Sequence, residues 1–461
     1  MKVYFLGGAG TVTGSKYLIE TNTQNILIDC GLFQGIKKLR DLNWSHLPVA
    51  VKSIDAILLT HGHLDHVGFI PRLIKMGFKG KIYGTAPSIE IAEIILMDSA
   101  KIQEEEAAKA NAEGYSKHKP AEALYTIKEA HNSLSYFHEV EEGSWHQLFP
   151  NIRFRMQYVG HIIGASFITL EAEGKKFVFS GDVGRENDIL MSKPKRPSKA
   201  EYIFLESTYG DRNHPDEDVE LILKDLILET HAKGGTLIIP SFAVERTQIL
   251  MYLLWKLQSN NEIPKIPMIM DSPMGSNVLK VFYKYHAWHK LSEADFEQMC
   301  QSFTITQDFQ ETLKVIANKS PKIVIAGSGM VSGGRVLTYL QSYITEKSTA
   351  ILLAGFQAEG TRGRKLLEGA TDLKIYGDYY DVKASIYSLN SLSAHADQSE
   401  LIGWLSEIKE APKKIFLVHG EPHATDSLRQ KIEDHYDWQC HIPELFEIYE
   451  IKETEGNKLK K

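Results

Sequence analysis

The chain has 461 residues, of which 43% are hydrophobic, and a formal net charge of -7 at pH 7. It is too long for one compact core and too apolar for a disordered protein, so two or more packed units are expected. The acidic charge argues against a protein covered in positive charge. It does not exclude nucleic acid as a ligand, because phosphate contacts need only a local basic groove.

The cysteines and the hydropathy of the chain indicate its compartment. Cys30, Cys300 and Cys440 lie far apart in the sequence without paired spacing, which suits a reducing environment. The N-terminal residues lack the basic start and long apolar stretch of a secretory signal, and no later apolar run is long enough to cross a bilayer. We therefore expect a cytoplasmic protein that does not bind a membrane.

Short apolar stretches separated by Gly, Asn and Thr predict β-strands in the first part of the chain. They cover residues 3–6, 16–19, 25–28, 54–59, 153–156, 166–170 and 176–180. Helical patterns lie between them, at residues 67–76, ending near Gly77, and at about 88–113. The mixture of strand pairs with helices predicts a layered α/β unit.

After about Tyr209 the pattern changes to longer helices that alternate with buried strands. The strands are expected at residues 235–240, 267–270 and 322–326. Such alternation predicts a second domain with a parallel sheet. Beyond about Ser385 the short strand and turn pattern returns, for example at residues 414–419.

The strongest chemical signal is a dense cluster directly after the strand predicted at residues 54–59. It holds His61, His63, Asp65 and His66 within six residues. Zinc favours imidazole nitrogens and carboxylate oxygens as ligands. In extended backbone His61 and His63 point to the same side. Asp65 and His66, at the turn into the helix, can bind a metal ion at a neighbouring position. One loop can therefore serve two metal ions, and the alternative is a polar loop with incidental histidines.

Two single residues further along the chain are candidates for additional ligands. His161 follows Gly160, and Asp182 sits at the end of a predicted strand. Either could be an ordinary turn residue, because lone histidines are often satisfied by backbone groups. However, two metal ions need more ligands than the first cluster supplies, which favours both residues as ligands.

The ordered set of Asp29, the cluster at residues 61–66, His161 and Asp182 resembles the metallo-β-lactamase superfamily. The resemblance implies an αββα sandwich that holds two zinc ions, with Asp182 bridging them. It also implies that Asp29 orients the histidine loop through hydrogen bonds. The ligands implied for the first ion are His61, His63 and His161, and those implied for the second are Asp65 and His66.

Four later patches resemble the β-CASP nucleases, the group that contains the cleavage and polyadenylation endonuclease subunit, ribonuclease J and bacterial homologues. The patches are residues 204–210, 326–335, 393–397 and 417–421. This resemblance, which spans nearly the whole chain, implies that His395 is a catalytic histidine held by Glu206. It also implies that His419 is a further metal ligand.

The resemblance implies the division of the chain into domains as well. We expect a metallo-β-lactamase domain at residues 1–208 and 387–461, with an α/β β-CASP domain inserted at residues 209–386. Because the chain starts directly at the first strand, we expect it to lack the N-terminal RNA-binding extension of archaeal relatives. We also expect it to lack the large C-terminal domain of ribonuclease J.

A glycine-rich segment at residues 327–335 is the best candidate for phosphate binding, because small residues let backbone N–H groups approach phosphate oxygens. Such a turn can equally be structural, but the resemblance favours phosphate contact. Segments 241–246 and 356–364 also look like family segments, although surface arginines are more often simply solvated. The residues predicted to bind RNA or phosphate are Ser328, Gly329, Ser332, Gly334, Arg335, Arg246 and Arg364.

The function that the resemblance implies is a zinc-dependent ribonuclease with two zinc ions per chain. It would hydrolyse phosphodiester bonds of single-stranded RNA in RNA processing or decay, leaving a 5′-phosphate and a 3′-hydroxyl, and we prefer an endonuclease. His419 favours RNA over DNA, because DNA-repair relatives usually carry valine at that position. The predicted catalytic residues are His395, Glu206, Asp65 and Asp182.

Besides a DNA nuclease, which His419 disfavours, three alternatives stay open. One is a 5′ exoribonuclease of the same family. Another is a small-molecule hydrolase acting on a thioester or lactam, which shares the first ligand motifs but needs no inserted domain. The third is a non-catalytic RNA-binding scaffold, although scaffolds that have lost catalysis lack metal ligands and every expected ligand is present here. A homodimer stays open as the assembly.

Overall fold

The computed structural model describes residues 1–114, 118–355, 357, 359–389 and 391–451, which form two compact units. The first unit comprises Met1–Val183, Pro194–Arg212 and Ala396–Lys461, and the second comprises Gly184–Lys193 and Asn213–His395. The second unit therefore interrupts the chain of the first. Among the described residues, no helix combines the length and the apolar character that crossing a membrane requires.

The first unit contains two seven-stranded sheets. The order of strands in one sheet is β22 (Ile448–Glu450), β1 (Lys2–Gly7), β2 (Lys16–Glu20), β3 (Asn25–Ile28), β4 (Ala56–Leu58), β5 (Lys81–Thr85) and β6 (Phe137–Val140). The order in the other is β21 (Cys440–His441), β20 (Lys414–Val418), β11 (Tyr202–Glu206), β10 (Lys175–Phe179), β9 (Ser166–Ala172), β8 (Ile152–Tyr158) and β7 (Trp145–Phe149). Both sheets are mixed, with β3 to β6 parallel in the first and β10, β11, β20 and β21 parallel in the second.

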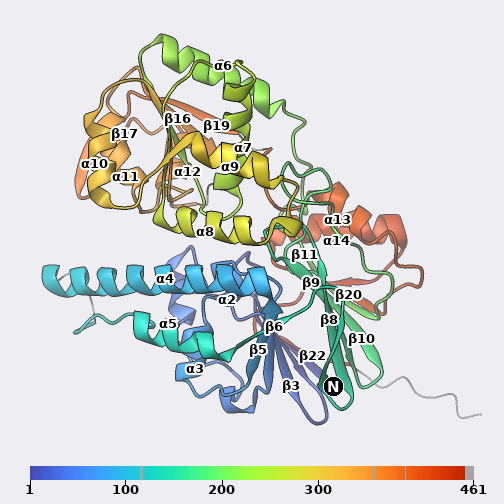
Figure 1. Ribbon diagram of the computed structural model, residues 1–461. Coiled ribbons are helices and arrows are strands. Elements are labelled where there is room, and N and C mark those ends of the chain that lie inside the picture. The colour runs from blue at the N-terminus through green and yellow to red at the C-terminus, as the bar shows by residue number, and fades with distance from the viewer. Residues whose placement is uncertain (115–117, 356, 358, 390, 452–461) are drawn as a thin grey trace, which may run out of the picture. The chain divides into compact units, whose positions relative to one another are not determined.

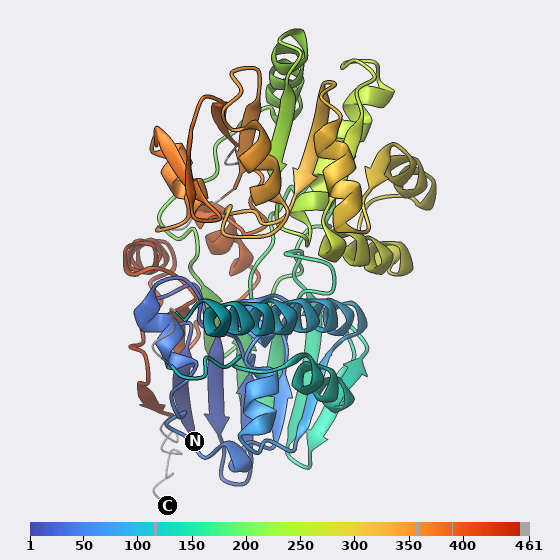
Figure 2. The same cartoon turned by 90° about the vertical axis from the view of Figure 1, so that its left-hand side faces the viewer.

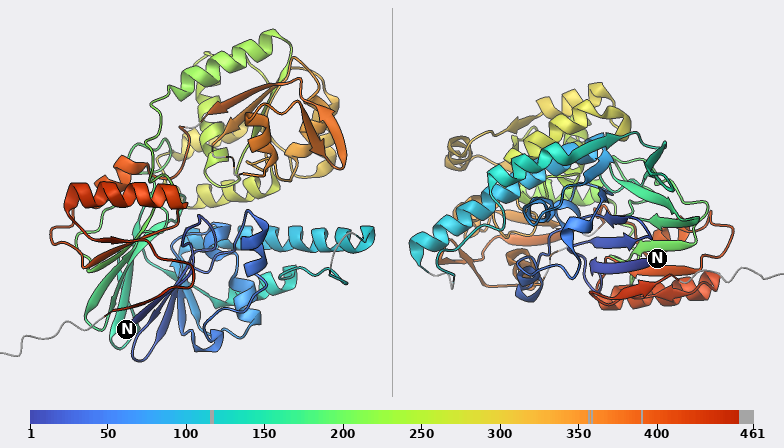
Figure 3. Two further views of the ribbon diagram at one scale, coloured as in Figure 1. Left: turned by 180° about the vertical axis from the view of Figure 1, so that it is seen from behind. Right: turned by 90° about the horizontal axis from the view of Figure 1, so that it is seen from below.

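Apolar side chains from both sheets form one core between them. Phe204 of β11 is central to it, with its ring centroid 4.3 Å from that of Phe179 and 4.8 Å from that of Phe416. Helices cover the outer faces, so the layers run helix, sheet, sheet, helix (Figures 1 and 3). The expected αββα sandwich is confirmed. The helices of this unit are α1 (Lys37–Leu42), α2 (Leu64–Val67), α3 (Ile70–Lys75), α4 (Ala86–Glu113), α5 (Ile127–Ser133), α13 (Gln398–Trp404) and α14 (Pro422–Tyr436), with the 3-10 turns η1 (Val51–Ser53) and η2 (Leu134–Tyr136).

The single helix predicted at residues 67–76 is wrong, because two short helices, α2 and α3, stand there instead. Pro71 lies in the first turn of α3, and proline has no backbone N–H to continue an earlier helix. A Cβ atom on Gly68 would lie 2.4 Å from the carbonyl oxygen of Leu64, so the chain turns closely at this point. The break lets α2 carry Asp65 and His66 on a turn of its own.

The second unit is built on a six-stranded sheet in which every pairing is parallel, which confirms the predicted parallel sheet. Its strand order is β14 (Phe303–Ile305), β13 (Met268–Asp271), β15 (Lys322–Ala326), β12 (Thr236–Pro240), β16 (Ala350–Ala354) and β19 (Ser385–Leu389), beside a hairpin of β17 (Asp372–Ile375) and β18 (Asp378–Asp381). Helices flank both faces of the sheet (Figure 2). They are α6 (Val219–Ala232), α7 (Arg246–Ser259), α8 (Pro273–Lys284), α9 (Glu293–Gln301), α10 (Phe309–Ala317), α11 (Val336–Tyr343) and α12 (Arg362–Leu367), with the 3-10 turn η3 (His286–Trp288).

Candidate metal centre

The candidate ligands gather because their loops follow strands of the first unit that run in one direction. Asp182 follows β10 and His419 follows β20, and both strands pair in parallel with β11, which ends at Glu206. Parallel strands bring their carboxyl ends to one edge of a sheet, where ligands of α/β proteins commonly bind. His161 follows β8, which has the same direction as β10 because each pairs antiparallel with β9.

A first group of donor atoms joins His61, His63, His161 and Asp182, whose ligand atoms all lie within 4.8 Å of one another. His63 Nδ1 lies 3.1 Å from His61 Nε2 and 3.1 Å from His161 Nε2. Asp182 Oδ2 lies 3.4 Å from His61 Nε2 and 3.5 Å from His161 Nε2. Three ring nitrogens and one carboxylate oxygen therefore converge on one point.

A second group joins Asp65, His66 and His419. His419 Nε2 lies 3.3 Å from Asp65 Oδ2 and 3.4 Å from His66 Nε2. The other oxygen of Asp182, Oδ1, lies 3.3 Å from His66 Nε2 and 3.4 Å from His419 Nδ1. Asp182 thus directs one carboxylate oxygen to each group, and the structure brings together all seven residues that the sequence predicted as ligands.

The converging atoms fit divalent metal ions better than they fit hydrogen bonds to one another. A ring nitrogen offers one proton or one lone pair, so three nitrogens at a single point cannot all be satisfied among themselves. Tetrahedral zinc with bonds of about 2.0–2.1 Å to nitrogen sets neighbouring ligand atoms about 3.3 Å apart. The separations in both groups, 3.1–3.5 Å, lie around that value. The donor set therefore fits two neighbouring metal sites, with the Asp182 carboxylate between them.

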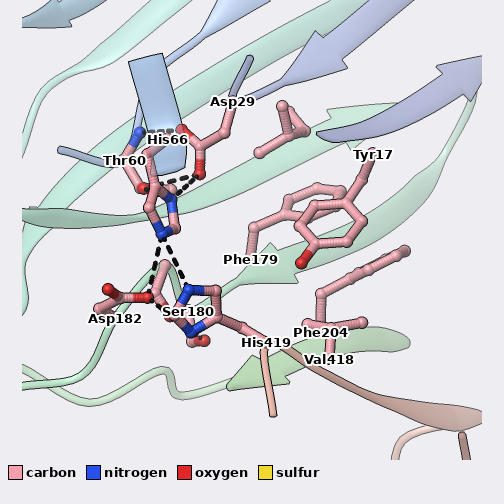
Figure 4. Close-up of a pocket in the computed structure, with 12 residues that line it drawn as sticks. Tyr17, Asp29, Thr60, His66, Phe179, Ser180, Asp182, Phe204, Val418 and His419 are labelled. Carbon is pink, nitrogen blue, oxygen red and sulfur yellow. Dashed lines mark hydrogen bonds and ion pairs between the residues drawn. The ribbon is translucent and has the colours of Figure 1, made fainter. Parts of the chain in front are cut away.

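A buried hydrogen-bond network fixes His66 from behind (Figure 4). Asp29 accepts from His66 Nδ1, from the Thr60 backbone N–H and from the Thr60 hydroxyl, each at 2.8 Å. Because Nδ1 donates its proton to Asp29, Nε2 is the ring nitrogen of His66 that faces Asp182 and His419. Asp29 has a φ of 57°, in the left-handed region that aspartate tolerates better than most residues.

Burial and neighbouring charges set the protonation states of the cluster. Burial and the adjacent His66 lower the pKa of His61 to about 3, which keeps this imidazole neutral, as a metal ligand must be. Burial alone would lower the pKa of His66, but the Asp182 and Asp29 carboxylates raise it well above its usual value. Burial alone would raise the pKa of Asp182, but His419 and His66 hold it well below its usual range. Asp182 is therefore ionised and available as a ligand.

Glu206, at the end of β11, is buried beside this cluster. Its carboxylate accepts from the Val183 N–H at 2.6 Å and from the Thr208 hydroxyl. The Thr208 hydroxyl also lies 3.2 Å from His419 Nδ1. Glu206 thus braces the residue that follows Asp182 and, through Thr208, contacts the ring of His419.

His395 is the last residue of the second unit, directly before Ala396 of the first. Its N–H donates to Ser393 Oγ at 3.2 Å, and its carbonyl oxygen lies 2.9 Å from His214 Nε2. The N–H of Ala396 donates to the carbonyl of Val183, next to Asp182, at 2.7 Å. The predicted pairing of His395 with Glu206 would join the two units and stays a prediction.

The predicted phosphate loop follows β15 in the second unit. The hydroxyl of Ser328 accepts from the N–H groups of Ser332 at 3.1 Å and Gly333 at 3.2 Å, so these donors converge on one oxygen. Gly334 has a φ of 71°, and a Cβ there would lie 2.5 Å from the carbonyl oxygen of Gly327. Only glycine fits that position, and the loop is compact. Its contact with phosphate stays a prediction.

The predicted RNA-contacting arginines are each engaged within the second unit. Arg335 Nη1 contacts the buried carboxylate of Asp271 and the hydroxyl of a neighbouring threonine. Arg246 Nη1 donates to the backbone carbonyl at the end of β16, and Arg364 pairs with an exposed glutamate directly after the end of α12. The exposed pair is weak enough to exchange for phosphate, whereas Arg335 is a brace for its loop. Phe356 and Ala358, in the segment that contains Arg364, lie outside the described residues.

Comparison with known proteins agrees with this architecture. Residues 9–227 match the Metallo-beta-lactamase superfamily, residues 247–366 match the Beta-Casp domain, and residues 379–443 match the Zn-dependent metallo-hydrolase RNA specificity domain. "Ribonuclease TTHA0252" from Thermus thermophilus is 31% identical over 431 residues, which cover 91% of this chain and 93% of that protein. The chain belongs to the β-CASP branch of the metallo-β-lactamase superfamily.

Other relatives of this β-CASP protein carry different names. "Transcription termination factor FttA" from Methanocaldococcus jannaschii is 27% identical over 469 residues, covering 98% of this chain and 72% of that protein. A crystal structure of a protein of unknown function from Enterococcus faecalis shares the fold, with a TM-score of 0.53 and 12% identity, covering 97% of this chain and 99% of that one.

Sequence reasoning missed two hydroxyl residues of the site. Thr60 contacts both Asp29 and His61 Nδ1, and Thr208 contacts both Glu206 and His419. Each threonine stands close to a predicted site residue in the sequence. However, threonines are common at strand ends, and only the folded positions of the hydrogen-bond partners set these two apart from others.

Proposed function

We propose that this β-CASP protein is a zinc-dependent endoribonuclease that hydrolyses phosphodiester bonds of single-stranded RNA. One observation carries the proposal: two groups of metal-type donor atoms share the carboxylate of Asp182. The similarity to a bacterial ribonuclease over 93% of that protein's length supports RNA as the substrate. A small-molecule hydrolase would not need the inserted β-CASP domain, and a non-catalytic scaffold would not need a complete donor set.

The metal ions would be held by His61, His63, His161, Asp65, His66, His419 and the shared Asp182. When bound, such ions supply an activated water and neutralise the charge that develops on the phosphoryl oxygens. Asp182 keeps the two donor groups in register, because its two oxygens lie in one rigid carboxylate.

Departure of the sugar oxygen needs a proton. In the proposed reaction His395 donates this proton to the leaving 3′-oxygen, while the 5′-phosphate product keeps the oxygen taken from water. Imidazole suits the task because its pKa lies near neutral pH. Glu206 would orient that ring and stabilise its charged form, a role that rests on the family resemblance.

The experiment is cleavage of a circular single-stranded RNA by zinc-loaded protein, beside the matched linear RNA and a circular DNA. A circle has no end, so an endonuclease opens it and a 5′ exonuclease leaves it intact. The variants are His395→Ala and, as a matched control, His423→Ala, whose side chain is 87% exposed at the start of α14. Zinc content is measured for every protein.

We expect the wild type and His423→Ala to open the RNA circle and leave the DNA intact. His395→Ala should keep its zinc and lose roughly 100- to 10,000-fold in rate, the range that general acid catalysis contributes. Cleavage of linear RNA only, into mononucleotides, would make the protein a 5′ exonuclease. A zinc-loaded wild type that cuts no RNA would overturn the proposal.

A further inference from the structure

Two loops of the second unit lie side by side at one edge of its sheet. Strands β12 and β15 pair in parallel, from Thr236 opposite Lys322 to Pro240 opposite Ala326. The chain therefore leaves both strands at the same edge, into Ser241 and Phe242 after β12 and into the glycine-rich loop after β15. Carboxyl edges of parallel sheets are where α/β domains commonly bind nucleotides and other ligands.

The aromatic ring of Phe242 lies directly against the glycine-rich loop. A Cβ atom on Gly329 would lie 2.5 Å from Phe242 Cδ2 and 2.7 Å from Cε2, so the ring occupies the space that any side chain at this position would need. Phe242 is nevertheless 40% exposed. An apolar ring is thus open to solvent beside the predicted phosphate loop.

The backbone of Phe242 is fixed by its neighbours. Its carbonyl accepts from the Thr247 N–H at 3.2 Å, the Thr247 hydroxyl at 2.7 Å and the Ser241 hydroxyl at 3.1 Å. The Ser241 N–H donates to the carbonyl of Ala326, the last residue of β15. The ring is therefore presented from a rigid position, which lowers the entropy cost of using it for binding.

We propose that Phe242 is a stacking platform for one nucleobase of single-stranded RNA, with the adjoining phosphate at the loop of Ser328 to Gly334. The inference rests on the proposed function, because it assigns a binding site for the proposed substrate. Every base has an aromatic face, so stacking on one phenylalanine binds RNA without selecting a sequence. The acidic chain can then hold RNA with few cationic contacts.

The stacking site lies two strands away from β19, the strand that precedes His395 in the chain. Along the sheet, β12 is followed by β16 and then by β19, whose chain continues to His395. Two strand spacings amount to about 10 Å. A base stacked on Phe242 would therefore belong to a nucleotide close to the strand that leads to His395.

The test compares the affinity of zinc-loaded protein for a short single-stranded RNA and for the same backbone without bases. Both carry phosphorothioate linkages that resist hydrolysis, and binding is followed by fluorescence anisotropy. The variants are Phe242→Leu, which keeps an apolar side chain against Gly329, and Phe242→Trp, which keeps an aromatic face. Tyr379→Leu is the matched control, since Tyr379 is 68% exposed on the β17–β18 hairpin of the same unit.

In the wild type, the RNA with bases should bind more tightly than the abasic backbone. Phe242→Leu should lower that ratio by roughly 5- to 150-fold, the range reported for loss of one stacking partner. Phe242→Trp and Tyr379→Leu should keep the wild-type ratio. If the wild type cleaves ordinary RNA but Phe242→Leu keeps the ratio, this inference is overturned and the proposed function stands. A wild type that neither binds nor cleaves RNA would overturn both.

Discussion

Replacing Asp29 by Asn should switch the tautomer of His66 and so weaken one metal site. In the wild type, Oδ1 of Asp29 accepts from the Thr60 N–H, while Oδ2 accepts from the Thr60 hydroxyl and from His66 Nδ1. The amide of asparagine must keep its oxygen toward the Thr60 N–H, because the opposite orientation would set two donors against each other. Its NH₂ group then faces His66.

An NH₂ group at that place donates to His66 Nδ1, which must give up its proton. The proton moves to Nε2, the atom that lies 3.3 Å from Asp182 Oδ1 and 3.4 Å from His419 Nε2. A protonated nitrogen cannot bind a metal ion. Binding at the second donor group would therefore need the proton to return to Nδ1, and the free energy of that tautomer change weakens metal binding. Loss of such an orienting partner weakens metal binding by about 10- to 100-fold, or about 1.4–2.7 kcal/mol.

The backbone should tolerate this change. Asparagine accepts the positive φ of 57° at this position, and its shape matches that of aspartate. Competitive titration of zinc against a chelating dye, with total metal analysis, should therefore show one site weakened and the other kept. Asp55→Asn is the control, because Asp55 is exposed. In the described part of the chain, its carboxylate accepts one hydrogen bond, from the Asn25 N–H. Wild-type zinc affinity at both sites in Asp29→Asn would refute the reasoning. Equal weakening of both sites would mean that the substitution disturbs the whole structure and not the tautomer of His66.

Three further changes test the centre, the core and a buried charge. Asp182→Asn removes the shared ligand, so zinc content should fall and RNA cleavage should drop roughly a hundredfold or more, and retention of both ions would contradict the shared role. Phe204→Ala empties the aromatic core and should cost about 3–5 kcal/mol in urea unfolding, while a loss far below this would mean that the core collapses around the cavity. Burial lowers the pKa of Lys16 from 10.5 to about 8, so between these values the unfolded state binds more protons and stability rises with pH. From pH 8 to 9 the wild type should gain about 1 kcal/mol more than Lys16→Met, and equal gains in the two proteins would contradict this.

The local part of the site was readable from the sequence because its chemistry is local. His61 and His63 share a loop, and their two-residue spacing places both in one donor group, while Asp65 and His66 fall in the other. The parallel sheet of the second unit was equally readable, since strands buried on both faces are continuous apolar runs. Neither inference depends on which distant segments meet.

The remainder of the site depends on strand order, which no local pattern encodes. His66 and His419 are separated by 353 positions, yet their ring nitrogens lie 3.4 Å apart. His66 follows β4 in one sheet and His419 follows β20 in the other, so they meet only because β20 lies beside β11 and the two sheets pack face to face. The contacts of Thr60 and Thr208 follow from the same pairings. A hydroxyl residue shows its role only when its partners are placed.

The strand order also explains why one carboxylate can serve both donor groups. Strands β10, β11 and β20 are consecutive neighbours, so Asp182, Glu206 and His419 emerge at one edge of a single sheet. Glu206 lies between the other two and holds the N–H of Val183, which limits how far Asp182 can turn toward either side. The two oxygens of Asp182 consequently point to different groups: Oδ2 faces His61 and His161, and Oδ1 faces His66 and His419. A carboxylate shared between the two donor groups is therefore a consequence of adjacent parallel strands, and shifting β20 by one place in the sheet would take His419 away from the second donor group.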